Sequence, residues 1–372
     1  MNKQIIVIGG GLAGLTAAIH LSRAGKEVLL IERHSYPKHK VCGEYVSNEV
    51  LPYLKELGID PFEAGAVSID TLQFSSGSGK MLTTKLPLGG FGLSRFTLDK
   101  LLFEKAVESG CKVMEDTVTK VRFKNDKFSV ETQSGEKFES EIVIGSFGKR
   151  SNLDKSLSRK FITKKTPWIG VKSHYAAQHP DHIVGLHNFK GGYCGISKVE
   201  NNRINVCYLA HLDSFGKYKD VDAFKDKVMQ TNPHLRNFFT NAEPLFEKAL
   251  TISQISFDQK NRVEDHVLMA GDSAALIHPL CGNGMAMAIM GAKLLSENIL
   301  NYFRNSEISH WQMEKNYSKE WEQHFKERLF YGRQLQRLLE HPELSDWGIR
   351  LAQYVPALIQ KLITKTHGRP QL

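Results

Sequence analysis

An aspartate beside a glycine, followed by small residues and a glycine-rich bend, is the first feature of this sequence that points to chemistry. Residues 270–289 read AGDSAALIHPLCGNGMAMAI, so that Asp272 directly follows Gly271. The apolar residues 267–270 predict a strand that ends at this pair. Small neighbours let a ligand approach the backbone, and a carboxylate accepts hydrogen bonds from the hydroxyl groups of a polyol. The stretch therefore predicts a binding turn.

A bend that contains Pro279, Gly282 and Gly284 follows this turn and leads into a predicted helix over 285–300. No Ser, Thr or Asp directly precedes the helix, so its first N–H groups need another acceptor. Asn283 is the alternative, because its side chain can cap a helix. The bend therefore predicts backbone N–H groups that face a ligand, unless Asn283 satisfies them.

The first sixty residues contain the pattern of a dinucleotide-binding turn, in which Gly9, Gly11 and Gly14 form G-x-G-x-x-G. The first Gly permits a tight turn, the second lets the backbone approach a pyrophosphate, and the third lets helix and strand pack closely. Glu32 ends the next predicted strand, where a carboxylate binds the ribose hydroxyls and disfavours a 2′-phosphate. The pattern predicts a site for NAD or FAD, and a glycine-rich turn that binds nothing is the alternative. The predicted elements are a strand over 4–8, a helix over 12–24 and a strand over 28–31.

Two later segments indicate further contacts with a ligand. Residues 92–110 predict a helix with Ser94 as its N-cap. Arg95 lies in its first turn, where the helix dipole disfavours a cation. A nearby anion would explain this arginine, and an ordinary surface position is the alternative. Residues 142–144 predict a buried strand that runs into a turn at Gly148, as a chain does when it passes close to a ligand.

Five motifs together resemble those of one flavoprotein superfamily. It comprises the aromatic hydroxylases of the para-hydroxybenzoate hydroxylase type, the flavin-dependent halogenases and the geranylgeranyl reductases. The similarity runs through most of residues 1–300. The motifs are GGGLAG with Glu32, KVCGE at 40–44, GLSRFTLD at 92–99, IGSFGKRS at 144–151 and AGDSAALIHPLCGNGMAMA at 270–288.

The resemblance implies how FAD would bind. Asp272 would contact the ribitol and pyrophosphate region, and the bend from Pro279 to Gly284 would lie beside the isoalloxazine ring. The following helix would aim its positive end at the N1–C2=O side of the ring, which stabilises the anion of the reduced flavin. Arg95 would reach towards the FAD. The cofactor-binding residues implied in this way are Gly9, Gly11, Leu12, Ala13, Gly14, Glu32, Arg33, Cys42, Gly43, Arg95, Val118, Gly148, Gly271, Asp272, Pro279, Gly282, Asn283, Gly284 and Met285.

The predicted fold class is α/β, with a Rossmann-like FAD-binding domain that is discontinuous in the sequence. We assign this domain residues 1–65, 92–155 and 262–304. Residues 66–91 and 156–261 alternate with period two and predict an antiparallel-sheet substrate domain. The resemblance implies that this sheet forms one wall of the substrate pocket, with Tyr193 and Cys194 as candidate contacts.

Residues 305–372 predict a helical C-terminal region. Apolar residues stand at helical spacing in its last part, WGIRLAQYVPALIQKLITKTHGR, and basic residues follow them. Such a stripe is typical of a helix packed on the core. A pocket lid or a peripheral contact with a membrane surface is the alternative.

FAD carries the chemistry and the protein selects the reaction, so two enzyme hypotheses compete. The first is a monooxygenase that hydroxylates a hydrophobic aromatic or polyketide-like substrate through a flavin C4a-hydroperoxide in a dry pocket. The second is a reductase that saturates C=C bonds of an isoprenoid or lipid. NAD(P)H or a separate flavin reductase would donate electrons, since no second G-x-G-x-x-G is visible. A flavin-binding redox sensor that uses Cys42 or Cys281 is the non-catalytic alternative.

Three residues are candidates for catalysis. Cys42, in a motif that resembles the Cys-Gly motif of geranylgeranyl reductases, is a proton donor or redox partner, or a small residue packed under the ring. Glu44 is an acid/base or a surface acid. His278 is a general base, or a histidine packed or bonded to the cofactor.

The substrate motifs favour the monooxygenase. Residues 191–199, GGYCGISKV, keep Tyr193, but Gly195, Ser197 and Lys198 stand where geranylgeranyl reductases typically have Trp, Phe and Pro. The Trp-x-Trp-x-x-Ile signature of the halogenases is missing. We therefore place the monooxygenase first and the reductase second.

Charge and cysteine content restrict the remaining classes. The formal net charge is +9, but the basic residues are spread out and accompany no recognition motif, which argues against nucleic-acid binding. A basic surface also suits anionic cofactors, substrates or membranes. The five cysteines form no CxxC pair, so we expect reduced thiols, a cytoplasmic location and no metal site. The histidines of HPDH at 179–182 have a spacing close to that of metal ligands. This segment lies in a predicted loop without further ligands, so we expect it to bind no metal.

Overall fold

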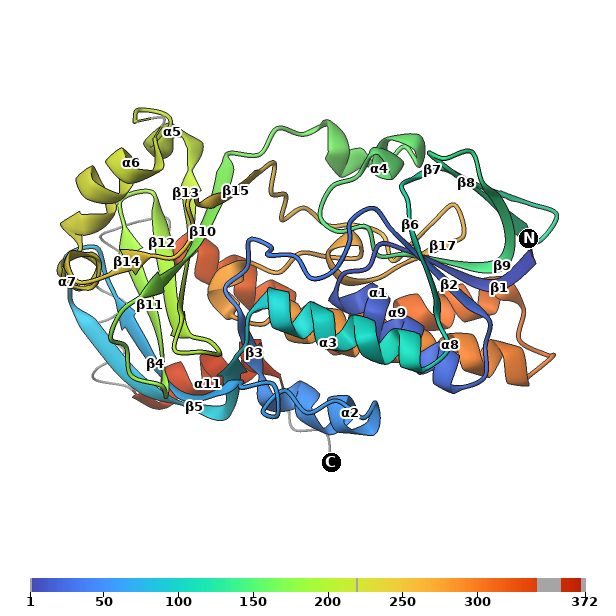
Figure 1. Ribbon diagram of the computed structural model, residues 1–372, viewed down its shortest axis with the longest axis horizontal. Coiled ribbons are helices and arrows are strands. Elements are labelled where there is room, and N and C mark those ends of the chain that lie inside the picture. Colours follow the sequence, from blue (N-terminus) through green and yellow to red (C-terminus); the bar gives the residue numbers. More distant parts are fainter. Residues whose placement is uncertain (1, 219, 340–355, 369–372) are drawn as a thin grey trace.

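The computed structural model describes residues 2–218, 220–339 and 356–368, which form two sheets with helices packed against them (Figure 1). One sheet and its helices lie on the right of Figure 1, and the other sheet lies on the left. The largest apolar core lies in the first half, and smaller apolar clusters lie in the second. The molecule therefore has two layered halves that meet in its middle.

A mostly parallel sheet forms the first half, with strand order β16-β17-β9-β1-β2-β6. The central strand β1 pairs in parallel with β2 on one side and with β9 on the other. Ile5, Ile6 and Val7 have no exposed surface, which explains the continuous apolar run in this strand. The strands are β1 (Asn2–Ile8), β2 (Val28–Glu32), β6 (Lys112–Glu115), β9 (Lys137–Gly145), β16 (Val263–Glu264) and β17 (Val267–Met269).

Helices pack together below this sheet in Figure 1. α1 contacts both α3 and α8, and α8 also contacts α9. Ser94 caps α3 as predicted, because its hydroxyl accepts a hydrogen bond from the backbone N–H of Thr97. The helices are α1 (Leu12–Arg23), α3 (Arg95–Glu108), α8 (Gly284–Arg304) and α9 (His310–Leu339).

The second sheet has nine strands in the order β14-β10-β13-β12-β11-β4-β5-β3, with β15 paired to β10. Its described pairings are antiparallel, except that β11 pairs with β4 in parallel. The strands are β3 (Tyr45–Ser47), β4 (Val67–Ser75), β5 (Met81–Gly92), β10 (Trp168–Ala176), β11 (Ile183–Phe189), β12 (Gly192–Lys198), β13 (Ile204–His211), β14 (Glu243–Pro244) and β15 (Leu250–Ser253).

Shorter elements complete the fold. A hairpin of β7 (Val118–Lys124) and β8 (Lys127–Thr132) continues the first sheet from β9. The short α-helices are α2 (Leu51–Glu56), α4 (Asn152–Ser156), α5 (Leu212–Phe215), α6 (Val221–Lys227), α7 (Pro233–Thr240) and α11 (Pro356–His367). The 3-10 helices are η1 (Asn48–Val50), η2 (Lys160–Thr163), η3 (Met229–Thr231), η4 (Gly271–Ser273) and η5 (Pro279–Cys281).

The predicted fold class is confirmed: a Rossmann-like sheet, a second sheet that is antiparallel apart from one pairing, and a helical C-terminal region. The domain boundaries stay a prediction. β3 falls within the assigned segment 1–65 but pairs with β5 in the second sheet.

The C-terminal region packs on the protein where it is described. The hydroxyl of Ser47 donates to the backbone oxygen of His367, and Ile363 is buried. The predicted apolar positions up to residue 355 lie outside the described residues. Among the described helices, none combines the length and the apolar character that a membrane span needs.

Candidate cofactor and active site

The turn between β1 and α1 has the shape that a phosphate-binding turn needs. Gly9 has a φ of +98°, and a Cβ atom there would lie 2.5 Å from the backbone oxygen of Ser146. A Cβ atom on Gly14 would lie 2.0 Å from the backbone oxygen of Gly9. By contrast, a Cβ atom on Gly11 would meet nothing within 4 Å. Packing thus requires the first and third glycines, whereas the second leaves open space at the helix start.

Helix α1 begins at Leu12 without a side-chain cap, since Gly11 occupies the N-cap position. Its first N–H groups and its dipole therefore suit an anion. Glu32 ends β2 beside this turn, and its carboxylate accepts a hydrogen bond of 2.6 Å from the backbone N–H of Gly10. The hydroxyl of Tyr36 donates to the backbone oxygen of Gly10 at 2.6 Å. Arg33, the next residue after Glu32, is exposed.

The Gly-Asp turn lies against the same helix. A Cβ atom on Gly271 would come within 3.0 Å of the Cβ of Ala13 and within 3.8 Å of that of Ala288. The turn is thus held between the starts of α1 and α8. A small cavity there is lined by Asp272, Gly284 and Trp321, among others. Val118 is buried at the start of β7.

The side chains of Lys260 and Ser273 fix the chain around Asp272. The ammonium group of Lys260 donates to the backbone oxygens of Asp272 at 2.6 Å and of Lys149 at 3.1 Å. Burial lowers the pKa of Lys260 to about 8. The hydroxyl of Ser273 donates to the backbone oxygen of Gly148 at 3.0 Å. The glycine turn after β9 and the Gly-Asp turn are therefore joined.

Helix α8 begins without a side-chain cap. Asn283 occupies the N-cap position, but its amide donates to the backbone oxygen of Thr366 at 2.7 Å. Its side-chain oxygen has no partner among the described residues. The 3-10 helix η5 (Pro279–Cys281) comes shortly before Asn283 in the chain. Gly282, which lies between them, has a φ of +60°. The first N–H groups of α8 are therefore available to a ligand, as predicted.

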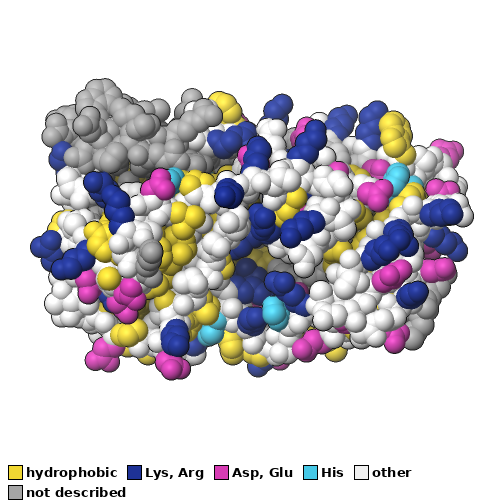
Figure 2. Space-filling view, turned by 90° about the horizontal axis from the view of Figure 1, so that it is seen from above, with side chains coloured by type: hydrophobic (Ala, Val, Ile, Leu, Met, Phe, Trp, Pro, Cys, Tyr) yellow, Lys and Arg dark blue, Asp and Glu magenta, His cyan; other side chains and the backbone are white. Residues whose placement is uncertain are grey.

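These observations fit FAD. Two uncapped helix starts and an open glycine suit the pyrophosphate and the flavin ring, and Glu32 and Asp272 would contact the ribose and ribitol hydroxyls. Figure 2 shows Lys and Arg side chains gathered around a hollow in the middle of one face of the molecule. Such a field attracts an anionic cofactor.

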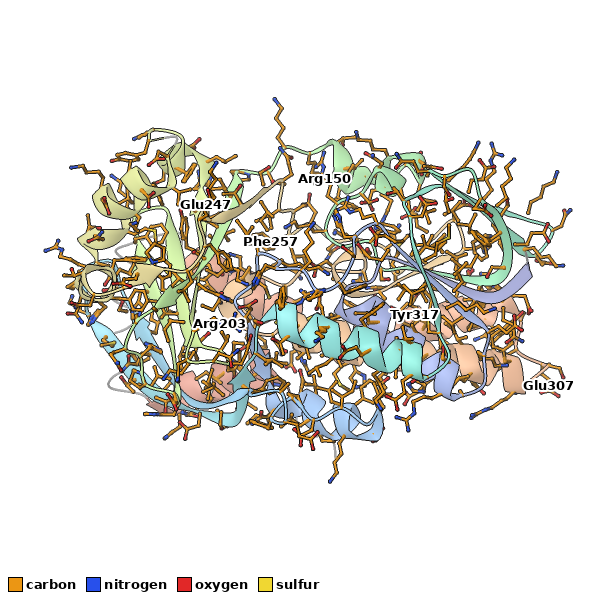
Figure 3. The ribbon with its side chains drawn as sticks, viewed as in Figure 1. Arg150, Arg203, Glu247, Phe257, Glu307 and Tyr317 are labelled. Carbon is orange, nitrogen blue, oxygen red and sulfur yellow. The ribbon has the colours of Figure 1, made fainter. Side chains whose placement is uncertain are left out.

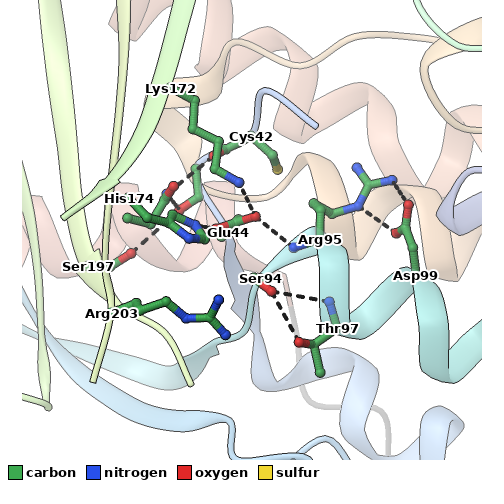
Figure 4. Close-up of polar contacts among 12 residues, drawn as sticks. Cys42, Glu44, Ser94, Arg95, Thr97, Asp99, Lys172, His174, Ser197 and Arg203 are labelled. Carbon is green, nitrogen blue, oxygen red and sulfur yellow. Dashed lines mark hydrogen bonds and ion pairs between the residues drawn. The ribbon is translucent and has the colours of Figure 1, made fainter. Parts of the chain in front are cut away.

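Glu44 is the centre of a buried polar network (Figure 4). Its carboxylate pairs with the ammonium group of Lys172, lies 2.7 Å from Nε2 of His174 and accepts a 2.7 Å hydrogen bond from the backbone N–H of Arg95. Burial alone would raise the pKa of Glu44, but the hydrogen bond from His174 and the charge of Lys172 hold it below its ordinary value. Glu44 also has a φ of +55°, which is uncommon for a residue with a side chain. It is therefore not a surface acid.

Cys42 lies next to this network and is partly exposed. The side-chain amide of Asn205, on β13, donates to the backbone oxygens of Cys42 at 3.2 Å and of Gly43 at 2.8 Å. Burial raises the pKa of the Cys42 thiol, so it is protonated at neutral pH. The second sheet thus fixes the Cys-Gly segment, and Gly43 has open space around its Cα.

Arg95 has an anionic partner within its own helix. Its guanidinium group makes two hydrogen bonds to Asp99, at 2.7 and 2.9 Å, and Asp99 also pairs with Lys40. The side chain of Asp99 is 1 % exposed. This explains a cation in the first turn of α3, because an (i, i+4) carboxylate neutralises it. A contact between Arg95 and FAD stays a prediction.

His278 lies in an aromatic cluster. Its ring is 4.8 Å from that of Phe257, 6.0 Å from that of Tyr193 and 6.3 Å from that of Trp168 (ring centroids). Figure 3 shows Phe257 in the middle of the molecule, between the two halves. Burial lowers the pKa of His278 to about 3, so the imidazole is neutral. Neither ring nitrogen has a hydrogen-bond partner among the described residues.

The bend after His278 connects this aromatic cluster to the Cys-Gly segment. A Cβ atom on Gly282 would lie 3.2 Å from the ring of Tyr45, which follows Glu44 in the chain.

Of the two candidate substrate contacts, Tyr193 faces His278, but Cys194 does not. Cys194 belongs to a different apolar cluster, on the other face of β12, because successive residues of a strand point to opposite faces.

Sequence reasoning missed five residues of this site: Trp168, Lys172, His174, Asn205 and Phe257. Lys172 and His174 are two residues apart in β10, and the alternation of that segment placed them on one face. That face is buried in the structure, whereas a polar pair at period two is typical of a solvated face. Only the tertiary arrangement shows that both residues point at Glu44.

Comparisons with known proteins agree with the geometry. The family model "FAD binding domain" matches residues 2–320. The chain is 28 % identical to digeranylgeranylglycerophospholipid reductase 1 of Methanothermobacter thermautotrophicus, over 79 % of this chain and 76 % of that protein. It is 24 % identical to conditioned medium factor receptor 1 of Dictyostelium discoideum, over 86 % and 67 % of the two chains.

The fold is also that of solved flavoproteins. The structure of the flavin-dependent brominase Bmp2 aligns with a TM-score of 0.83 at 18 % identity, covering 99 % of this chain and 94 % of the other. The resemblance to the hydroxylase, halogenase and geranylgeranyl reductase superfamily is thereby confirmed. The match covers well over half of the sequence. The chain therefore belongs to the FAD binding domain family, and it is an FAD-dependent oxidoreductase.

Proposed function

We propose that this protein is a monooxygenase that hydroxylates a hydrophobic molecule with a phenolic ring. The observation that supports this most strongly is His278, a neutral imidazole in an aromatic cluster, whose two nitrogens have no hydrogen-bond partner among the described residues. An unpaired buried polar group costs about 1–3 kcal/mol. A phenol would reduce this cost, because its hydroxyl can donate to one ring nitrogen while its ring packs against the aromatic side chains. A purely hydrocarbon chain would leave both nitrogens unpaired.

The residues of the pocket would then have separate roles. Trp168, Tyr193 and Phe257 would bind the substrate ring and keep water out. His278 would hold the phenol by accepting a hydrogen bond from its hydroxyl group, which fixes the position of the ring. The bend that begins at Pro279 would hold the substrate at a fixed place relative to the start of α8.

FAD, when bound, would pass two electrons from a reductant to O₂, so that one oxygen atom enters the substrate and the other leaves as water. The uncapped start of α8 would stabilise negative charge at its end of the site. NAD(P)H or a separate flavin reductase would supply the electrons.

Product analysis with two substrate classes tests this proposal. The FAD-loaded protein, supplied with O₂ and a reductant, is incubated with long-chain phenols and, separately, with prenylated alkenes. We expect the phenols to gain the mass of one oxygen atom. His278→Phe should form this product about 100-fold more slowly, since it removes the hydrogen-bond acceptor that positions the phenol but keeps an aromatic ring.

His182→Phe is the matched control, because His182 is exposed and lies outside the pocket. It should hydroxylate at the rate of the unchanged protein. Full activity of His278→Phe on the phenols, or no phenol hydroxylation at all, would reject the proposed role.

The second candidate is reduction of C=C bonds in an isoprenoid or lipid. It is favoured by the protonated thiol of Cys42, which Asn205 holds in place through the backbone, and by the named activity of the Methanothermobacter relative. In this case Cys42 would donate the proton that follows hydride transfer. The prenylated alkenes would gain two hydrogen atoms, and Cys42→Ser would slow this reaction while His278→Phe would not.

A further inference from the structure

Two histidines and a glutamate converge at one point on the first half of the molecule, and none of them belongs to the cofactor site described above. Nδ1 of His266 lies 2.8 Å from Oε1 of Glu314, and Nδ1 of His310 lies 2.9 Å from the same oxygen. The ligand-type atoms of the three residues all lie within 4.8 Å of one another. Figure 3 labels Glu307, just before α9, and Tyr317 inside it, and the group lies at the first turns of this helix.

Two different elements bring these residues together. His310 and Glu314 are one helical turn apart at the start of α9, so they share a face. His266 comes from the turn between β16 and β17, in which Asp265 and His266 have φ angles of +46° and +64°. Two adjacent residues in this conformation form the tight turn that joins the two antiparallel strands of a hairpin. The turn thus holds His266 towards α9.

The partners of His310 are incomplete. Although Nδ1 is close to Oε1 of Glu314, the geometry is not that of a hydrogen bond, and neither ring nitrogen of His310 has such a partner among the described residues. Its side chain is only 14 % exposed. A cation shared by the three groups would give the ring of His310 the partner that it lacks among the described residues.

We propose that His266, His310 and Glu314 bind one divalent transition-metal ion of the Zn²⁺ class. Imidazole and carboxylate ligands suit Zn²⁺, which takes three protein ligands and a water molecule in tetrahedral geometry. Metal–ligand distances near 2.1 Å would set the ligand atoms about 3.4 Å apart. The present spacings of 2.8 and 2.9 Å would need to open by about half an ångström, which side-chain rotation permits.

An aromatic ring shields one side of the proposed metal site. The ring of Phe123 lies 4.1 Å from that of His266 and 5.4 Å from that of His310, so apolar groups cover one side of the site. Three residues after His266, the backbone oxygen of Met269 accepts a 2.6 Å hydrogen bond from Tyr317 of α9. Metal binding would therefore join α9 to the hairpin that leads into the Gly-Asp turn.

Titration of the full-length protein with Zn²⁺ and Co²⁺ tests this proposal. The protein is first treated with a chelator, and binding is followed by calorimetry and by the melting temperature. We expect one equivalent to bind and to raise the melting temperature. His266→Ala and His310→Ala should each weaken Zn²⁺ binding by at least about 100-fold, because loss of even an outer-shell partner costs 10–100-fold. Glu314→Gln, which keeps the shape of the side chain, should weaken it as well.

His324→Ala is the matched control, because His324 is exposed on the same helix. It should bind Zn²⁺ like the unchanged protein. The Co²⁺ complex should show the visible bands of a tetrahedral site without absorption from thiolate ligands. Absence of binding in the unchanged protein, unaltered affinity in the three ligand variants, or thiolate absorption would each overturn the proposal.

Discussion

Glu44 is a carboxylate without exposed surface, held by Lys172, His174 and a backbone N–H group. Such a group is stable only because its partners compensate for the loss of water. The sequence offered Glu44 as a candidate, but not its partners, which lie 128 and 130 residues further along the chain. No local pattern encodes that distance. The role of this residue therefore follows from the pairing of strands and not from the KVCGE motif.

Removing the charge of Glu44 should destabilise the fold. Glu44→Gln leaves Lys172 buried without a counter-ion, so we expect a loss of about 3–5 kcal/mol in the free energy of unfolding. Lys172→Met should cost a similar amount. The double variant should cost clearly less than the sum of the two, because neither charge remains. Urea unfolding of the four proteins measures this coupling, and strict additivity would show that the pair is not coupled.

His278 should make stability depend on pH. Its pKa is about 3 in the folded protein, below the ordinary 6.5 of a histidine in an unfolded chain. The unfolded state therefore binds more protons between these values, and stability falls as the pH falls below 6.5. The contribution lost by pH 5 is about 2 kcal/mol.

His278→Phe tests this dependence, because it removes the titrating group. Its free energy of unfolding should fall less between pH 7 and pH 5 than that of the unchanged protein. Urea unfolding at both pH values measures the difference, and His182→Phe, at an exposed position, should retain the original slope. Equal slopes for His278→Phe and the unchanged protein would contradict the assigned pKa.

At the scale of elements, the β1–α1–β2 unit was the most predictable part of the molecule. Its glycine spacing, apolar strand and amphipathic helix are local features, and the structure places strand, helix and Glu32 where they predict. The start of α8 was predictable in the same way. What Asn283 does instead of capping was not, because its partner Thr366 lies 83 residues away. Local physics determines elements, whereas packing determines their partners.

Substitutions at two glycines of the first turn should affect FAD affinity and the free energy of unfolding differently. A Cβ atom on Gly11 meets nothing in the protein, so Gly11→Ala should change the free energy of unfolding of the FAD-free protein by less than about 0.5 kcal/mol. It should nevertheless weaken FAD binding by at least about tenfold, since the methyl group occupies the approach of the pyrophosphate. Fluorescence titration with FAD measures the affinity.

Gly14→Ala provides the contrast. Its Cβ atom would lie 2.0 Å from the backbone oxygen of Gly9, so this variant should also destabilise the FAD-free protein, by about 1–3 kcal/mol. If Gly11→Ala bound FAD normally, the pyrophosphate would not lie at this turn.

At the scale of the whole molecule, the site depends on both halves and on the C-terminal helix. The second sheet contributes Lys172, His174 and Asn205, and α11 contributes the backbone oxygen that Asn283 binds. The protein has a formal net charge of +9. Basic side chains also gather around the hollow in the middle of the face that Figure 2 shows. The field they create should draw in an anion from solution.

Association of FAD should therefore depend on salt. Raising NaCl from 0.05 to 0.5 M should slow the association rate of FAD several-fold, because salt screens the attraction. Stopped-flow fluorescence with the FAD-free protein measures this rate. Riboflavin, which lacks the phosphates, is the control and should associate at a rate that salt barely changes. Equal salt dependence of the two ligands would show that the basic hollow does not attract FAD.

A single-turnover experiment with ¹⁸O₂ tests the central claim most directly. The FAD-loaded protein is reduced without oxygen, a phenol is bound, and ¹⁸O₂ is admitted before the product is analysed by mass spectrometry. We predict that the product carries one ¹⁸O atom and that His278→Phe yields little of it. A product without ¹⁸O, or complete conversion of the electrons into hydrogen peroxide with the phenol unchanged, would contradict the monooxygenase and leave C=C reduction as the candidate to pursue.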